Sequence, residues 1–176
     1  MLKIKDEMNC VALSIEFDEY IPFTAEFECD SLSPPLYWRV GDGSLSLMEI
    51  GLNKNSGVVQ SVTLTSIRTE NIRKVSYAYV VSVSESVGLP IFDLSNWVKD
   101  SYSDEFANNF IDEFNVELDL ILGQNFISVS IVDGKKPVRF INNNNVIFGI
   151  DAEDFLSNVD IINVSEENIK IIESAI

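Results

Sequence analysis

The stretch from residue 45 to residue 67 decides the fold class of this chain. It reads Leu45-Ser-Leu-Met-Glu-Ile-Gly-Leu52, then Asn53-Lys-Asn-Ser-Gly57, then Val58-Val-Gln-Ser-Val-Thr-Leu-Thr-Ser-Ile67. Both flanks alternate apolar and polar residues, which is the period of a half-buried strand. The five middle residues are rich in Asn and Gly, which accept the positive φ angles of a tight connection. The stretch therefore predicts an antiparallel hairpin.

The same alternation recurs on both sides of this hairpin. It predicts further strands over residues 11–17, 21–27, 36–40, 75–84, 115–122, 126–132, 137–141 and 146–150. Turn-forming Gly, Pro, Asn and Asp separate these runs, and short connections between alternating runs favour antiparallel pairing. We therefore predict antiparallel sheets built from hairpins.

Two segments depart from the strand pattern. Near 104–113, Ser103 is a candidate N-cap, and Phe106, Phe110 and Phe114 follow at a spacing of four. Near 166–174, Ser165 is a candidate N-cap ahead of two acids and an isoleucine-rich face. Hydroxyl caps and first-turn acids stabilise helix N-termini. With these two short helices, the predicted fold class is mainly β (α+β).

Two parts of the chain resemble each other at an offset near 100 residues. Gly51-Leu-Asn corresponds to Gly149-Ile-Asp, and Tyr37-Trp-Arg-Val corresponds to Pro137-Val-Arg-Phe. The pattern indicates an internal duplication, 1–88 and 89–176, whose two β units pack as a sandwich or as one long curled sheet. Amphipathic hairpins in general look alike, which is the alternative explanation. A length of 176 residues predicts a single domain, 1–176, in either case.

The charge narrows the expected partners. The chain has 28 acids, 12 bases and no histidine, for a net charge of −16. Binding nucleic acid, or an anionic membrane, needs Lys and Arg, so we expect neither as a partner. A basic protein is the natural complement, because opposite fields speed encounter and exclude wrong partners. Acidity that serves solubility alone is the alternative explanation.

Cysteine usage and hydropathy indicate a cytoplasmic protein. Cys10 and Cys29 are too few for a disulfide framework. The first residues contain no apolar run of signal-peptide length, and no stretch approaches the roughly 18 apolar residues of a membrane span. We expect both thiols to be reduced.

The common catalytic patterns are missing from the sequence. Without histidine there is no Ser-His-Asp or Cys-His arrangement, and two cysteines are too few for a zinc site. No Gly-rich phosphate loop is present. Paired carboxylates, as in a small glycosidase, remain open, but 28 acids produce such pairs by chance. We therefore expect no enzyme, no cofactor and no metal.

Acidic residues are concentrated in segments, and one segment is a candidate binding site. Residues 93–120 carry eight acids against one base, Lys99, and include the least regular part of the chain. Binding residues concentrate on such loops, where aromatic side chains serve as anchors. The predicted partner-binding residues are Asp100, Asp104, Glu105, Asp112 and Glu113, with Trp97 and Tyr102 as anchors.

One segment also resembles a known family. The hairpin Glu49-Ile-Gly-Leu-Asn-Lys-Asn-Ser-Gly-Val-Val-Gln-Ser-Val-Thr-Leu-Thr, in a small acidic chain without histidine, resembles the immunity proteins of bacterial contact-dependent growth inhibition and related polymorphic toxin systems. The resemblance covers under a tenth of the chain, and no site residue is carried over. It implies a cytoplasmic protein that binds a cognate toxin domain, often a basic nuclease, and blocks its active site. We expect a monomer or a 1:1 heterodimer.

A second hypothesis is a β-sandwich carbohydrate-binding or adhesin-like module. Such a module needs solvent-exposed aromatic side chains in a groove. This hypothesis expects Trp38 and Trp97 to be exposed and coplanar.

Overall fold

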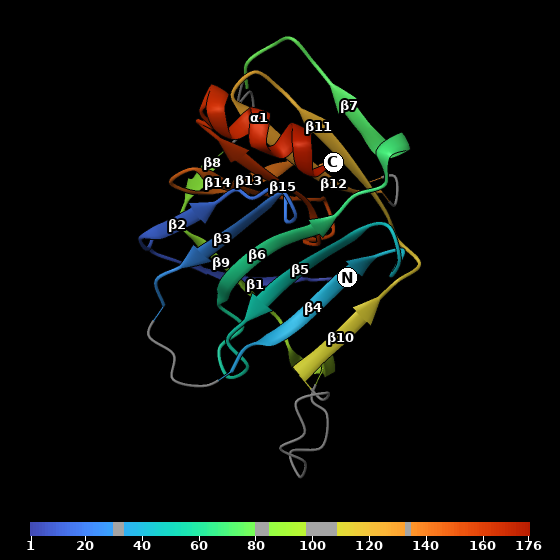
Figure 1. Ribbon diagram of the computed structural model, residues 1–176. Helices are drawn as coiled ribbons and strands as arrows, with labels where there is room; N and C mark the ends of the chain where they lie inside the picture. The colour runs from blue at the N-terminus through green and yellow to red at the C-terminus, as the bar shows by residue number, and fades with distance from the viewer. Residues whose placement is uncertain (30–33, 80–84, 98–108, 133–134) are drawn as a thin grey trace.

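The computed structural model describes residues 1–29, 34–79, 85–97, 109–132 and 135–176. Within these ranges the chain is mainly β, and two large sheets account for most of its strands (Figure 1). The predicted fold class is therefore confirmed. Because alternating side chains give each strand one apolar face, the two sheets bury those faces against each other.

A six-stranded sheet contains the hairpin predicted over residues 45–67. Its strand order is β10-β4-β5-β6-β3-β2. The strands are β2 (Leu13–Glu16), β3 (Phe23–Phe27), β4 (Leu36–Gly41), β5 (Leu47–Leu52), β6 (Val59–Ser66) and β10 (Phe110–Glu113). All neighbours pair antiparallel except β10, which pairs parallel with β4. The predicted hairpin is thus confirmed as β5 and β6.

A seven-stranded sheet faces the first, in the order β7-β11-β12-β15-β14-β13-β8. Its strands are β7 (Ile72–Lys74), β8 (Glu85–Val87), β11 (Glu117–Leu122), β12 (Phe126–Val132), β13 (Arg139–Asn143), β14 (Val146–Ile150) and β15 (Leu156–Ile162). A separate ribbon pairs β1 (Ile4–Met8) with β9 (Leu89–Phe92). Two short 3-10 turns, η1 (Thr69–Asn71) and η2 (Ser95–Trp97), complete the connections described.

Both sheets contribute to one hydrophobic core. Trp38, Ile50 and Leu64 of the six-stranded sheet and Leu120 of the seven-stranded sheet are fully buried in the same cluster. The helix α1 (Glu166–Ala175) adds Ile172 to this cluster. Such burial is the main favourable term in folding.

The helix predicted near 166–174 is confirmed as α1. The Ser165 side chain accepts a hydrogen bond from the Asn168 backbone N–H at 3.2 Å, as expected for an N-cap. No helix in the described part of the chain is long and apolar enough to cross a membrane.

The two sheets share one strand connectivity. In the six-stranded sheet the central order is β4-β5-β6-β3-β2, and in the seven-stranded sheet it is β13-β14-β15-β12-β11. The β5–β6 hairpin corresponds to the β14–β15 hairpin, and in each the strand register shifts directly after a glycine, Gly51 or Gly149. In each following turn one side chain, that of Asn53 or Asp151, accepts two backbone N–H groups. A duplication would produce these correspondences, and it stays a prediction.

Two of the predicted elements are wrong. The helix predicted near 104–113 is wrong for residues 110–113, which form β10, while 104–108 lie outside the described residues. A spacing of four places Phe106, Phe110 and Phe114 on one face of a strand as well as of a helix, so the spacing does not distinguish the two. The strand predicted over 75–84 is wrong for 75–79, which are not in a strand, and 80–84 lie outside the described residues.

Candidate functional site: an acidic hairpin and the groove beside it

The structure separates the residues predicted to bind a partner. Asp100, Tyr102, Asp104 and Glu105 lie outside the described residues. Trp97 ends the turn η2, where it is half-buried and packs against the hydrophobic core. The other two, Asp112 and Glu113, are on β10.

Both carboxylates on β10 have partners within the chain. Because β10 pairs parallel with β4, Asp112 lies opposite Arg39 and forms a two-pronged ion pair with it, at 2.7 and 2.9 Å. The hydrogen bond that Arg39 donates to Asp112 is the main cause of the raised pKa of the Arg39 guanidinium. Glu113 pairs with the ammonium group of Met1. The predicted acids therefore do not form an uncompensated surface in the part that the structure describes.

The outer face of the six-stranded sheet carries two rows of mostly polar residues. One row, in strand order from β2, is Glu16, Thr24, Thr63, Glu49, Arg39 and Asp112; the other is Ser14, Glu26, Ser61, Gly51, Tyr37 and Phe110. At the β10 side, Arg39 lies between two acids. At the β2 side the rows contain acids and no cation.

The β2–β3 hairpin is the most one-sided charged element of the described chain. We call residues 11–29 the acidic hairpin, because they contain five acids and no Lys or Arg. All five are exposed, and none is in an ion pair within the described ranges: Glu16, Asp18, Glu19, Glu26 and Glu28. Tyr20, at the turn, is 84% exposed. The acidic hairpin thus offers uncompensated charge and one aromatic anchor.

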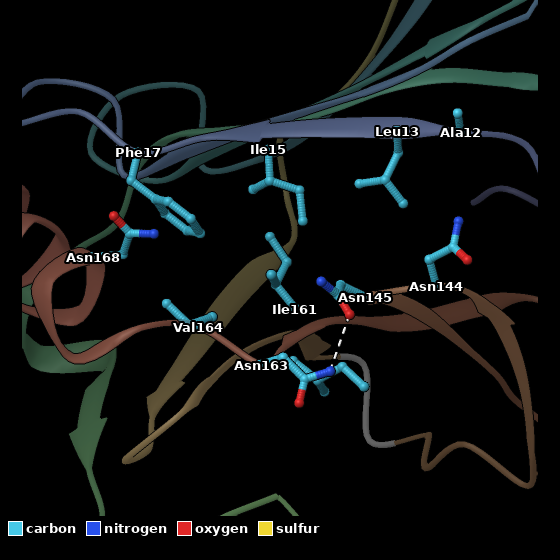
Figure 2. Close-up of a pocket in the computed structure, with 11 residues that line it drawn as sticks. Ala12, Leu13, Ile15, Phe17, Asn144, Asn145, Ile161, Asn163, Val164 and Asn168 are labelled. Carbon is cyan, nitrogen blue, oxygen red and sulfur yellow. Dashed lines mark hydrogen bonds between the residues drawn. The ribbon is translucent and has the colours of Figure 1, made fainter.

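A groove of about 520 Å³ lies along the acidic hairpin (Figure 2). Figure 2 shows Leu13 and Ile15 of β2, and Phe17 just after it, pointing toward Ile161 of the other sheet and Val164 of the loop that follows. Four amide side chains surround this apolar floor, namely those of Asn144, Asn145, Asn163 and Asn168. The groove therefore has apolar walls and a rim that can both donate and accept hydrogen bonds.

A cluster of hydrogen-bonded polar side chains, centred on Asp160, lies on the outer face of the seven-stranded sheet. Asp160 of β15 is 3% exposed and accepts a hydrogen bond from Asn158 Nδ2 at 2.8 Å. The Tyr79 hydroxyl reaches the other oxygen of Asp160, and its ring lies edge-on against Phe126. Burial raises the pKa of Asp160, while hydrogen bonds with Ser128, Tyr79 and Asn158 oppose that effect. Residues 75–79 thus cover a buried carboxyl.

Because the pKa of the buried Asp160 is raised, we expect the stability of the fold to depend on pH. A carboxyl whose folded-state pKa is raised adds stability below its unfolded pKa and loses it as pH rises through the folded value. The unsubstituted chain should therefore lose stability as the pH rises from about 4 to 7, while Asp160→Asn, which cannot ionise at this position, should not. We expect the free energy of unfolding of Asp160→Asn minus that of the unsubstituted chain to become more positive over this range. Urea unfolding at several pH values measures this, and Asp119→Asn on β11 controls for the loss of one charge. An equal difference at every pH would contradict the prediction.

The sequence contains a signal for the acidic hairpin, although its residues are not among the predicted binding residues. The predicted strands over 11–17 and 21–27 form this hairpin. The signal is that residues 11–29 contain acids but no Lys or Arg. The groove was not predictable, because its walls come from β2 and from residues about 150 positions further along the chain.

The two tryptophans that the carbohydrate-binding hypothesis expects to be exposed are not an exposed pair. Trp38 is fully buried in the core, and Trp97 packs against the same core. The two side chains therefore do not form an exposed coplanar platform. Among the described residues no group of three or more potential ligands could hold a metal ion.

No family model and no curated protein sequence match this chain.

Proposed function

We propose that this chain is an immunity protein that binds a cognate basic toxin domain, a nuclease, and neutralises it by covering its active site. The observation that carries the proposal is the acidic hairpin, with five exposed acids, no cation and an exposed tyrosine at its turn. It acts without a cofactor, in the cytoplasm, as one copy of the chain per toxin domain.

The electrostatics of the hairpin suit such a partner. A nuclease has a basic cleft that holds phosphates, so an acidic surface can occupy the cleft in place of the substrate. Charges on a solvent-facing hairpin act over about a Debye length, roughly 10 Å at 0.1 M salt. On the outer face of the six-stranded sheet, Glu49 adds to the negative potential of the hairpin. At the far edge, the positive charge of Arg39, paired with Asp112, weakens this potential.

An exposed tyrosine next to acids complements this long-range attraction. Tyr and Trp dominate the binding energy of many interfaces, because they bury a large area with few rotatable bonds. The Asp18 carboxylate accepts a hydrogen bond from the Tyr20 backbone N–H at 2.7 Å, which shapes the turn that presents the ring. Steering by the acids and anchoring by Tyr20 are therefore separable contributions.

The test is recovery and kinetic analysis of the natural partner. A tagged chain is used to capture proteins from the source organism at low salt, and each captured protein is purified and assayed for nuclease activity with and without the chain. We expect a basic nuclease whose activity is lost at a 1:1 ratio. Its association rate should fall from about 10⁸ M⁻¹ s⁻¹ toward 10⁶ M⁻¹ s⁻¹ as salt is added.

Two results would contradict the proposal. One is a partner that is neutral or acidic. The other is association whose rate does not depend on salt, since that would remove the role of the acidic hairpin.

A further inference from the structure

The outer edge of β2 is an open sheet edge. In the described part of the chain, β2 ends the six-stranded sheet and pairs only with β3. The Glu28 N–H donates to the Ala12 carbonyl at 2.9 Å, so Ala12 directs its backbone toward β3. Backbone direction alternates along an antiparallel strand. Leu13 and Ile15 therefore direct their N–H and C=O groups away from β3.

At Val11, the backbone of this edge already has a hydrogen-bonding partner, the side chain of Asn143. The Val11 N–H donates to Asn143 Oδ1 at 2.9 Å, and Asn143 Nδ2 donates to the Val11 carbonyl at 3.0 Å. The carboxamide of Asn143 thus takes the place of a neighbouring strand at Val11. Within the described ranges Leu13 and Ile15 pair with no strand on this side, which leaves two donors and two acceptors in a row.

The groove lies directly under this edge. The side chains of Leu13, Ile15 and Phe17 are half-buried and line it (Figure 2). A strand added beside β2 would follow the same pleat, so every second side chain would enter the groove and the others would face outward. The volume of about 520 Å³ is within the range of typical ligand pockets, roughly 300–1,000 Å³.

The charge around the edge decides what can occupy it. The outward-facing residue next to Ile15 is Glu16, and Asp18, Glu19 and Glu26 are close to it on the same hairpin. A second copy of this chain would bring the same acids together and is disfavoured by repulsion. A segment with Lys or Arg at its outward positions is favoured.

We propose that β2 binds an extended segment of a basic protein as an additional strand, with apolar residues in the groove alternating with Lys or Arg beside Glu16. The sign of the partner's charge rests on the proposed function, whereas the position and the backbone pairing rest on the edge and the groove alone.

A peptide of alternating Val and Lys is the probe. Its comparison peptides are the same residues in scrambled order and the alternating peptide with two N-methylated valines, which cannot donate to the Leu13 and Ile15 carbonyls. Affinity is measured by fluorescence anisotropy, and amide hydrogen exchange is followed residue by residue by NMR. We expect the alternating peptide to bind at least about tenfold more tightly than either comparison peptide.

Amide exchange locates the binding site. In the free protein the Leu13 and Ile15 amides should exchange fast, while those of Ser14 and Glu16, which face β3, are protected. Adding the alternating peptide should slow exchange at Leu13 and Ile15 by about tenfold or more. Glu16→Lys should weaken binding about tenfold, whereas Glu117→Lys on β11, with the same change in net charge, should leave it within about twofold.

The outcomes separate this inference from the proposed function. Equal binding of all three peptides, or slowed exchange only at other amides, would overturn the added strand. If the captured nuclease binds in a salt-dependent way but leaves exchange at Leu13 and Ile15 unchanged, the added strand is wrong and the proposed function stands. If no basic nuclease is found but the alternating peptide still slows exchange at both amides, the edge site is supported and the proposed function fails.

Discussion

Replacing Gly57 with alanine is expected to lower the free energy of unfolding by about 3 kcal/mol or more. Gly57 closes the β5–β6 turn with φ at +79°, in the left-handed region. A Cβ at this position would be 2.0 Å from the Phe92 carbonyl oxygen. That oxygen belongs to the backbone of β9, whose Phe92 N–H donates to the Gly57 carbonyl at 2.9 Å, so it cannot rotate away. Urea unfolding measures the loss.

The corresponding turn of the second hairpin supplies a matched control. Asp154 has φ at +68° and forms an ion pair with Arg139 at 3.3 Å. Asp154→Gly relieves the backbone and removes this exposed ion pair, so we expect a change within about 1 kcal/mol. If Gly57→Ala also stays within that range, the close approach of β9 to this turn is wrong.

The second large effect concerns the acidic hairpin. Changing Glu16, Glu19 and Glu26 together to Lys is expected to slow association with the basic partner about 100-fold at low salt, because the local field changes sign. All three side chains are exposed and free of ion pairs in the described part of the chain, so the fold should tolerate the change. Stopped-flow association at several salt concentrations measures the rates.

A control with equal net charge separates the hairpin from bulk acidity. Changing Glu117, Asp119 and Glu167 to Lys alters the total charge by the same amount on the other sheet and the helix. We expect this variant to slow association about threefold or less. Equal slowing by both variants would show that only the total charge matters.

The sequence predicted those elements whose partners are close along the chain. The β5–β6 hairpin and α1 each carry a local signal, namely an Asn/Gly turn and a serine cap. By contrast, β15 was missed because Asn158 and Asp160 interrupt its apolar run, although both are buried and hydrogen-bonded. Such polar residues resemble a loop until their neighbours in the sheet are known.

The candidate site was harder to predict for a related reason. The sequence identified acids but not which of them are neutralised. Asp112 is neutralised by Arg39, which is 73 positions away along the chain. The acids of residues 11–29 have no ion-pair partner within the described ranges, and the sequence signal for this is the absence of a local base. Long-range pairing therefore decides which charges remain available to a partner.

The strands at the sheet edges also determine how the chain must fold. The seven-stranded sheet ends on β8, from the first half of the sequence, and the six-stranded sheet ends on β10, from the second half. The Leu156 N–H also donates to the Leu2 carbonyl at 2.9 Å, which joins β15 to the first residues of the chain. Contacts this far apart in sequence carry a large loop-closure cost, so folding should be slow for a chain of this size. During synthesis the six-stranded sheet cannot be completed until β10, which lies in the second half of the chain, has emerged from the ribosome.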